Sequence, residues 1–346
     1  MRILVITDLY PIMEDEKYTP RTIEAFVKTW QKQGHEVRII KPNFLLNSYI
    51  RKKPFYKDGI YGNVENINYI TPFLGDIKKK IKTLFAPDVV IAHMPSGLIF
   101  ANKLGVMYTA AVHSSDIEVL TNPIYKFYFK TELENAYKNA QKIACRSYVL
   151  REKFLSLYPQ YKSKTFVAPS GIDESIIIER NWEEKEKVRV LTCGQFVKRK
   201  NIDKVIKACE KYENIELTVV GSGKLEKKLK SISEKPIFTG QISRDEVLEK
   251  MRQSDIFILP SKNETFGMVY LEAMASGCIT VCSKGEGIDG IIQDGVNGFL
   301  AEDVETVLNT ILEHPNKTEI LENTRKTVYN YTEELMAKNY LDSIME

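Results

Sequence analysis

The chain has 346 residues, more than one hydrophobic core usually holds, so we expect two domains. Hydrophobic residues make up 43% and charged residues 27%, the balance of a soluble globular protein. The N-terminal apolar run is too short for a signal peptide, and no stretch is long enough to span a membrane. The five cysteines lack paired metal-ligand spacing, so we expect reduced thiols in a cytoplasmic protein and no metal site.

The charge is unevenly divided. Residues 1–165 contain 25 lysines and arginines against 15 acidic residues, whereas residues 166–346 contain 24 against 31. A basic half beside an acidic half suggests that the first half meets an anionic partner. We expect an anionic acceptor, or peripheral contact with an anionic membrane through residues 48–57 and 76–85, and no nucleic-acid partner.

The first half alternates strands and helices. A strand at Ile3–Thr7, a helix at Thr22–Lys32 and a strand at Val37–Ile40 predict a β-α-β unit. Residues 43–66 are predicted to be a long loop. The segment Ile77–Phe85 has one apolar face with lysines around it, which favours a helix covering the sheet; a helix lying on a membrane surface is the alternative.

The remaining strands of the first half lead to a connecting segment. They are expected at Asp88–Ala92, Val106–Val112, Ala140–Cys145 and Thr165–Ala168. The second of these is followed by His113-Ser-Ser-Asp116, which places a histidine at the carboxyl end of a buried strand. Residues 168–173 and the charged stretch 179–187 read as the connection between domains.

The pattern then restarts. Strands are expected at Val188–Cys193, Glu216–Val220, Ile237–Thr239, Ile256–Leu259 and Ile279–Cys282, and helices over 203–212, 224–233, 244–252, 303–313, 317–328 and 332–345. The predicted fold class is α/β, with two facing Rossmann-like αβα domains, 1–170 and 171–330, and C-terminal helices. We expect helix 331–346 to pack back on the first domain and a ligand cleft to lie between the two.

Residues 255–277 form the most informative stretch. The strand Ile256–Leu259 ends at Pro260, a turn carries Glu264, and a helix then runs to Gly277. Glu264 is thus expected at the carboxyl end of a strand and just before a helix N-terminus, where open α/β sheets bind anionic ligands. Glu272 follows on the helix. Two carboxylates with free amides between them suggest a polyol that carries phosphate.

Two further strand ends carry candidate chemistry. Lys198, Arg199 and Lys200 precede a predicted helix, where cationic side chains and amides act together on a diphosphate; a solvated charge run is the alternative. Gly221-Ser-Gly223 follows another strand, but the third glycine of a dinucleotide-binding fingerprint is replaced by Glu226. The NAD interpretation is therefore disfavoured, although the tight turn still lets a nucleoside approach.

The spacing of Glu264 and Glu272 resembles the Glu-x7-Glu motif of retaining family 4 glycosyltransferases, which have the GT-B fold. The likeness is strongest from about 188 to 300, where further stretches follow in the family's order: Gly194…Lys200…Asp203, Leu217–Gly223, Phe238–Ile242 and Asp294–Gly298.

The resemblance implies a metal-independent retaining transferase with no cofactor, using a UDP- or GDP-linked sugar as co-substrate. The acceptor would be a glycan or a lipid-linked molecule, in cell-surface polysaccharide or glycoconjugate synthesis. The enzyme would be cytoplasmic, with peripheral contact to the inner face of the membrane. The alternatives are a non-catalytic nucleotide-sugar-binding protein of the same fold and an NAD-dependent Rossmann enzyme.

The resemblance also assigns roles to residues. Glu264, Lys200 and His113 would be catalytic, with Lys200 stabilising the leaving diphosphate and His113 lying near the reacting sugar. The donor would be held by Arg199, Glu272, Phe266, Gly267, Met268, Gln241, Ile242 and Gly221, with the Glu272 carboxylate on the ribose hydroxyls. Thr19, Arg21, Thr22 and Asp116 are candidates for the acceptor site.

The sequence departs from the family pattern at three places. Gln195 stands where the family usually has an arginine, so one cation for the diphosphate is missing and Arg199 would only partly replace it. The first βα loop, Pro11–Pro20, carries Glu14-Asp-Glu16 instead of a glycine pair, which leaves the acceptor geometry open. Ser170 stands where asparagine is frequent.

Overall fold

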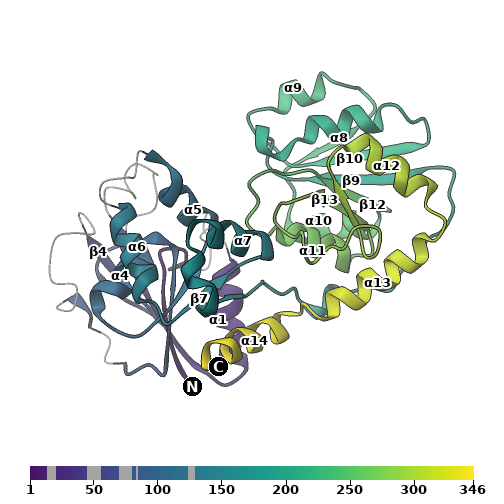
Figure 1. Ribbon diagram of the computed structural model, residues 1–346. Coiled ribbons are helices and arrows are strands. Elements are labelled where there is room, and N and C mark those ends of the chain that lie inside the picture. Colours follow the sequence, from purple (N-terminus) through teal and green to yellow (C-terminus); the bar gives the residue numbers. More distant parts are fainter. Residues whose placement is uncertain (14–20, 45–55, 70–79, 83–84, 124–128) are drawn as a thin grey trace. The chain divides into compact units, whose positions relative to one another are not determined.

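The computed structural model describes residues 1–13, 21–44, 56–69, 80–82, 85–123 and 129–346 (Figure 1). The chain divides into two compact units. Unit 1 comprises Met1–Arg146, Leu150–Ser170 and Met336–Glu346, and unit 2 comprises Ser147–Val149 and Gly171–Leu335. The C-terminal segment of the chain therefore belongs to unit 1.

Unit 1 is built on an eight-stranded sheet with the order β3-β4-β2-β1-β5-β6-β7-β8. Neighbouring strands run parallel except β3, which pairs antiparallel with β4. The strands are β1 (Arg2–Ile6), β2 (Glu36–Phe44), β3 (Gly59–Tyr61), β4 (Val64–Tyr69), β5 (Val89–His93), β6 (Thr109–Val112), β7 (Lys142–Cys145) and β8 (Thr165–Val167). Because helices cover parallel strands on both faces, these strands read as apolar runs rather than as alternating patterns.

Helices pack on both faces of this sheet. They are α1 (Thr22–Lys32), α4 (Met94–Leu104), α5 (Ser114–Thr121), α6 (Phe129–Asn139), α7 (Tyr148–Leu157) and α14 (Glu333–Met345). Side chains of α4, α6 and α7 form one apolar cluster with the sheet. α1 and α14 lie side by side (Figure 1), and the indole N–H of Trp30 donates a hydrogen bond to the carbonyl of Ala337 at 2.9 Å. The rings of Phe26, Trp30 and Tyr340 pack together between these two helices.

Unit 2 contains a six-stranded sheet with the order β11-β10-β9-β12-β13-β14, and all its strands run parallel. The strands are β9 (Val188–Cys193), β10 (Ile215–Val220), β11 (Ile237–Gly240), β12 (Ile256–Leu259), β13 (Ile279–Ser283) and β14 (Phe299–Ala301). The helices are α8 (Ile202–Cys209), α9 (Glu226–Lys230), α10 (Arg244–Arg252), α11 (Met268–Ala275), α12 (Val304–Glu313) and α13 (Lys317–Tyr329). The predicted α/β class with two Rossmann-like units is confirmed.

The prediction of a long loop over residues 43–66 was wrong at both ends, while residues 45–55 lie outside the described residues. β2 continues to Phe44, and β3 and β4 form a hairpin at the edge of the sheet. All six residues of β4 are buried although three of them are polar. The side-chain amides of Asn66 and Asn68 both donate to the backbone carbonyl of Tyr56, at 3.1 and 2.9 Å. A strand whose polar side chains are buried because they hydrogen-bond to the backbone of a neighbouring loop lacks the apolar pattern that identifies strands in a sequence.

Other expectations differ in their limits. β6 begins only at Thr109, because Val106 and Met107 are exposed rather than buried. The short strand β14 was not predicted. Most of the predicted helix Ile77–Phe85 lies outside the described residues. Of those described, Lys80 is helical and Lys82 is not, while Ile81 and Phe85 pack against the apolar cluster of unit 1. Residues 48–55 of the predicted membrane-contacting segment 48–57 also lie outside them.

The five cysteines carry free thiols, four of them buried and Cys193 half-buried. Within the described ranges, no helix is both long and apolar enough to cross a membrane. In the same ranges, no three His, Cys, Asp or Glu side chains are grouped so that they could hold a metal ion.

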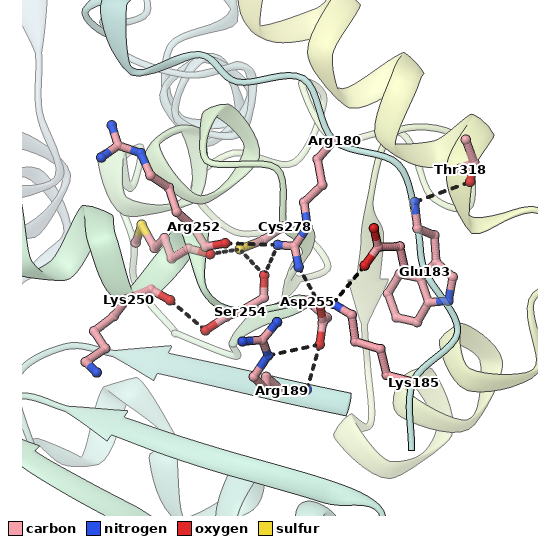
Figure 2. A network of polar contacts seen from close by, with 12 residues as sticks. Arg180, Glu183, Lys185, Arg189, Lys250, Arg252, Ser254, Asp255, Cys278 and Thr318 are labelled. Atoms are coloured by element: carbon pink, nitrogen blue, oxygen red, sulfur yellow. Dashed lines mark hydrogen bonds and ion pairs between the residues drawn. The ribbon is translucent and has the colours of Figure 1, made fainter. Parts of the chain in front are cut away.

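A buried carboxylate links the connecting segment to the N-terminal ends of the strands in the unit 2 sheet (Figure 2). Asp255, which directly precedes β12, is 5% exposed and forms ion pairs with Arg180 at 2.5 Å and Lys185 at 2.9 Å. It also accepts a hydrogen bond from the backbone N–H of Arg189 at 2.9 Å. Arg180 further donates to the carbonyls of Arg252 and Ser254. One carboxylate thus joins β9, β12 and residues 180–185.

Replacing Asp255 by alanine is expected to lower the free energy of unfolding of unit 2 by about 3 kcal/mol, because Arg180 and Lys185 then lose their buried counter-charge. Each unit contains one tryptophan, Trp30 or Trp182. Urea unfolding followed by Trp182 fluorescence in a Trp30→Phe background therefore reports unit 2. The control is Glu216→Gln, which breaks an exposed pair with Lys187 and should leave the free energy of unfolding nearly unchanged. Equal losses for both variants would contradict a structural role for Asp255.

Candidate functional site

The candidate site of unit 2 lies at the carboxyl edge of its sheet. Because all six strands run parallel, the loops that follow them emerge at this same edge. The loop after β9 carries Arg199 and Lys200, and the loop after β12 carries Glu264. The loops after β10 and β11 carry Gly221 and Gln241. Residues that are far apart in the sequence therefore meet along one edge.

Glu264 is held by the cations of the neighbouring loop. The Nζ atom of Lys200 lies 2.6 Å from Oε2 of Glu264, and Nη1 of Arg199 lies 3.6 Å from the same oxygen. The Lys200 and Glu264 side chains are 11% and 16% exposed, whereas Arg199 is 45% exposed. The backbone of the two loops is also joined, since the N–H of Lys262 donates to the carbonyl of Arg199 at 2.7 Å. The pair is thus a largely desolvated contact within a fixed loop arrangement.

Two glycines make room for the Glu264 side chain. A Cβ atom at Gly287 would lie 3.0 Å from Cγ of Glu264, and one at Gly267 would lie 3.2 Å from it. The backbone N–H of Glu264 donates to the carboxylate of Glu286 at 3.2 Å, and its carbonyl accepts from the N–H of Gly287 at 3.2 Å. The loop after β13 is therefore part of the site, although its residues were not predicted. Its Gly285-Glu-Gly287 sequence after a strand was the available signal.

The turn before α11 requires glycine. Gly267 is the N-cap of α11 and has a φ of 83°, in the left-handed region that favours glycine. A Cβ there would also collide with the ring of Tyr270, whose hydroxyl donates to the carbonyl of Leu259 at 2.7 Å. Phe266 is 3% exposed, so its side chain anchors the turn in the core. The amides of Met268 and Val269 lie in the first turn of the helix, where no intrahelical acceptor exists, whereas the amide of Tyr270 donates to the carbonyl of Gly267 at 3.0 Å.

Glu272 projects from α11 and has its own cation. Its Oε1 accepts from Nε of Arg244 at 2.9 Å, and the two side chains are 14% and 59% exposed. Arg244 is the first residue of α10, which begins with a capping box between Ser243 and Glu246. Sequence reasoning did not identify Arg244. A helix over 244–252 was predicted, but no pattern indicated that its first residue contacts Glu272.

The glycine-rich turn after β10 packs against a neighbouring loop. A Cβ at Gly221 would collide with the carbonyl of Gly194, and one at Gly223 would lie 2.8 Å from the carbonyl of Phe196. The N–H of Phe196 donates to the carbonyl of Ser222 at 2.8 Å. The absence of side chains at Gly221 and Gly223 thus lets the backbone of residues 194–196 pack closely against this turn. Gln195, in the same segment, has an exposed side chain.

Gln241 and Ile242 follow β11 and precede α10. The Gln241 side chain lies beside Ser222, whose hydroxyl donates to it at 3.5 Å. Ile242 is half-buried and packs against the apolar core of unit 2. The turn after β11 therefore borders the glycine-rich turn and the start of α10.

In unit 1, His113 follows β6 and directly precedes α5. Its backbone N–H donates to Oδ2 of Asp116 at 2.9 Å, and Oδ1 of Asp116 accepts from the hydroxyl of Tyr137 at 2.8 Å. Asp116 is completely buried, and burial raises the pKa of its carboxyl to about 7. This geometry favours a role for Asp116 in fixing the turn at His113 over its predicted contact with an acceptor.

Two of the other predicted acceptor residues, Arg21 and Thr22, lie at the start of α1. Arg21 forms an ion pair with Glu24 at 2.8 Å, and Thr22 is the first residue of the helix. Thr19 lies outside the described residues, as do Glu14, Asp15 and Glu16. Within unit 2, the structure brings Lys200, Arg199 and Glu264 together, while Glu272 pairs separately with Arg244.

His113 contacts a second histidine. Its Nε2 lies 3.2 Å from Nδ1 of His93, which ends β5. Burial and the neighbouring charge of Arg146 lower the pKa of His113 to about 3, and burial lowers the pKa of His93 well below its ordinary value. Both imidazoles are therefore neutral near pH 7, and one of them donates an N–H hydrogen bond to the bare ring nitrogen of the other.

Comparison with known proteins gives consistent matches over both units. The family model described as "Glycosyl transferases group 1" matches residues 173–331, and the one described as "Glycosyltransferase Family 4" matches residues 20–176. An uncharacterized glycosyltransferase of Methanocaldococcus jannaschii is 30% identical over 71% of this chain and 73% of its own length.

Solved structures share the fold. A sucrose-phosphate synthase from Thermosynechococcus elongatus has a TM-score of 0.75 and 16% identity, covering 99% of this chain and 98% of its own. HepE of Anabaena, solved in complex with UDP, has a TM-score of 0.74 and 15% identity, covering 100% of both chains. These likenesses show the fold of the GT-B glycosyltransferases.

The pKa values, lowered to about 3 for His113 and well below the ordinary value for His93, predict that neither imidazole titrates near pH 6.5. In the unfolded chain both imidazoles take up protons below about pH 6.5. Because the folded protein keeps them neutral, their contribution to its free energy of unfolding is highest above that pH and decreases as the pH falls toward 3. NMR spectra of protein with 15N-labelled histidine, recorded from pH 8 to pH 5, should show no protonation of these two residues. Titration of either with a midpoint near 6.5 would contradict the buried arrangement.

Proposed function

Because this chain belongs to the family 4 glycosyltransferases, we propose that it moves a sugar from a nucleoside diphosphate sugar to a glycan or lipid-linked acceptor, with retention of the anomeric configuration. The observation that carries the proposal is the pairing of Lys200 with Glu264 beside the N-terminus of α11. A desolvated ammonium and free helix amides suit a diphosphate, and a carboxylate suits sugar hydroxyls.

The leaving diphosphate needs positive charge, since the bond from the anomeric carbon to the phosphate oxygen breaks in the transition state. Lys200 and Arg199 supply this charge as fixed side-chain cations, so we propose that the reaction requires no metal ion and no other cofactor. Lys200 would turn from Glu264 toward the diphosphate when the donor binds. Arg199, which is more exposed, would partly replace the arginine that the family usually has at the position of Gln195.

The rest of the donor would be held along the same edge. Glu272 would accept the ribose hydroxyls, and the backbone at Gln241 and Ile242 would meet the base. Glu264 would orient the sugar together with the amides at Gly267 and Met268. Because HepE was solved with UDP, UDP is the first nucleotide to test, with GDP as the second arm.

The acceptor hydroxyl would attack the anomeric carbon on the face from which the diphosphate departs. A new bond forms between this carbon and the acceptor oxygen, and the hydroxyl proton passes to the departing phosphate oxygen. His113 would lie near the reacting sugar. Synthesis of a cell-surface polysaccharide or glycoconjugate fits such an acceptor, and contact with an anionic membrane stays a prediction.

The exposed Gln195 favours one alternative, a protein that binds nucleotide sugars without turnover. The two functions differ in a simple assay. Slow hydrolysis of the nucleotide sugar without an acceptor, detected as released UDP or GDP, supports the transferase. Tight binding without release of the nucleotide from any sugar offered supports the alternative.

Lys200→Ala and Glu264→Ala are each expected to lower kcat by about 100-fold or more, since each removes a charge that acts on the donor. Turnover of the best nucleotide sugar from a thermal-shift panel measures the effect. Lys204→Ala, on the exposed surface of α8, is the matched control and should leave kcat unchanged. Wild-type turnover in both site variants would refute the assignment.

Gly287→Ala should weaken UDP binding about 10-fold. The new Cβ would lie 2.8 Å from the carbonyl of Phe266 and 3.0 Å from Cγ of Glu264, so this carboxylate and its loop must move. Gly285→Ala is a close control, because Gly285 also has a positive φ but its Cβ would meet no atom within 4 Å. Calorimetric titration of UDP into both variants separates backbone strain from displacement of Glu264. Equal affinities would show that the packing of Glu264 is irrelevant to binding.

A further inference from the structure

Three neighbouring strands of unit 1 end in nitrogen-bearing side chains on one face of the sheet. His93 ends β5, His113 follows β6, and Arg146 follows β7. His93 is level with Ala111, and Ala111 is level with Ala144. Because side chains alternate along a strand, residues two positions beyond Ala111 and Ala144 share the face of His93. We call His93, His113 and Arg146 the basic row.

Arg146 is a buried cation. It is 5% exposed, its Nη2 donates to the hydroxyl of Ser170, and its guanidinium lies 5.7 Å from the centroid of the Phe26 ring. Among the described residues, no carboxylate forms an ion pair with it. Burial lowers the pKa of Arg146 to about 10, so the side chain still carries its charge near pH 7. An isolated charge is costly to bury, and an anion would compensate for this cost.

The surroundings of Arg146 contain further unsatisfied polar atoms. In the described part of the chain, Nε of Arg146, Nε2 of His93 and the hydroxyl of Tyr340 are buried without hydrogen-bond partners. The Tyr340 ring lies 6.5 Å from that of His93 and 5.4 Å from that of Phe26, the ring that also contacts the Arg146 guanidinium. Buried polar atoms normally have a partner, either protein, water or ligand. Here three of them belong to one cluster that also holds a positive charge.

We propose that the basic row binds a phosphate group of the acceptor substrate. Arg146, Tyr340 and His93 can each donate one hydrogen bond, which matches the three terminal oxygens of a phosphate better than the two of a carboxylate. A planar guanidinium is also well suited to phosphate. This proposal rests on the proposed function in one respect, namely that the phosphate belongs to the acceptor substrate.

A bound phosphate would also fix the protons of the two histidines. With its Nε2 donating to the anion, neutral His93 has a bare Nδ1 that accepts from Nε2–H of His113, the contact seen at 3.2 Å. This leaves Nδ1 of His113 as an acceptor. Phosphate binding would thus select one tautomer of His113, the half-buried member of the row.

The four histidines of the chain provide the test. Inorganic phosphate is titrated into 15N-histidine-labelled full-length protein at constant ionic strength, with saturating UDP present so that the nucleotide site is occupied. Resonances of His93 and His113 are expected to shift and to saturate at millimolar phosphate. His35 and His314, which lie elsewhere in the fold, should not shift. No saturable shift of the first two, or equal shifts of all four, would overturn the proposal.

Variants separate the row from general charge effects. Arg146→Gln should weaken phosphate binding at least 10-fold, whereas Arg38→Gln, an exposed arginine on β2, should leave it unchanged. If Arg146→Gln does not fold, judged by Trp30 fluorescence, Tyr340→Phe replaces it and should weaken binding about threefold. Unaltered affinity in the folded variant would refute the site, as would acetate binding more tightly than phosphate. Failure of UDP to bind would instead contradict the proposed function, because that readout reports unit 2.

Discussion

The ion pair between Lys200 and Glu264 joins the two loops on which the candidate site of unit 2 depends. Each charge is largely removed from water and therefore needs the other in the free protein. The surrounding loops leave Glu264 little freedom, because Gly267 and Gly287 both lie against its side chain. The site is thus arranged before any ligand arrives, and a diphosphate would compete with Glu264 for the ammonium of Lys200.

The sheets explain why such a site can exist. In unit 2, parallel strands carry separate loops to one edge, while Asp255 fastens the opposite edge to residues 180–185. In unit 1, the same geometry places His93, His113 and Arg146 at three adjacent strand ends. In both units, the residues that follow the C-terminal ends of parallel strands form a cluster. In unit 2 the cations of this cluster pair with carboxylates. In unit 1 the cluster contains a buried cation, and we propose that an acceptor phosphate neutralises it.

The sequence predicted most elements of unit 2 because its strands are apolar runs ended by proline, glycine or charged residues, as at Pro260. It failed where polar residues are buried for local reasons, as in β4, whose asparagines satisfy the backbone of Tyr56. The pairing of Lys200 with Glu264 was not foreseen, although both residues were selected individually. Arg244 was missed because its importance comes from a contact between segments distant in sequence, which no local pattern encodes. Gly287 was missed although two glycines after a strand mark a turn, because that signal does not say which side chain the turn contacts.

Lys200 and the turn at Glu264 are proposed to recognise the diphosphate of a nucleotide. This proposal is tested most directly by the ratio of UDP affinity to UMP affinity in wild-type protein and in Lys200→Ala, measured by calorimetry. Wild-type protein is expected to prefer UDP by about 10-fold or more, since the second phosphate meets the ammonium, and the preference should largely disappear in the variant. An unchanged preference for UDP in Lys200→Ala would contradict the proposal.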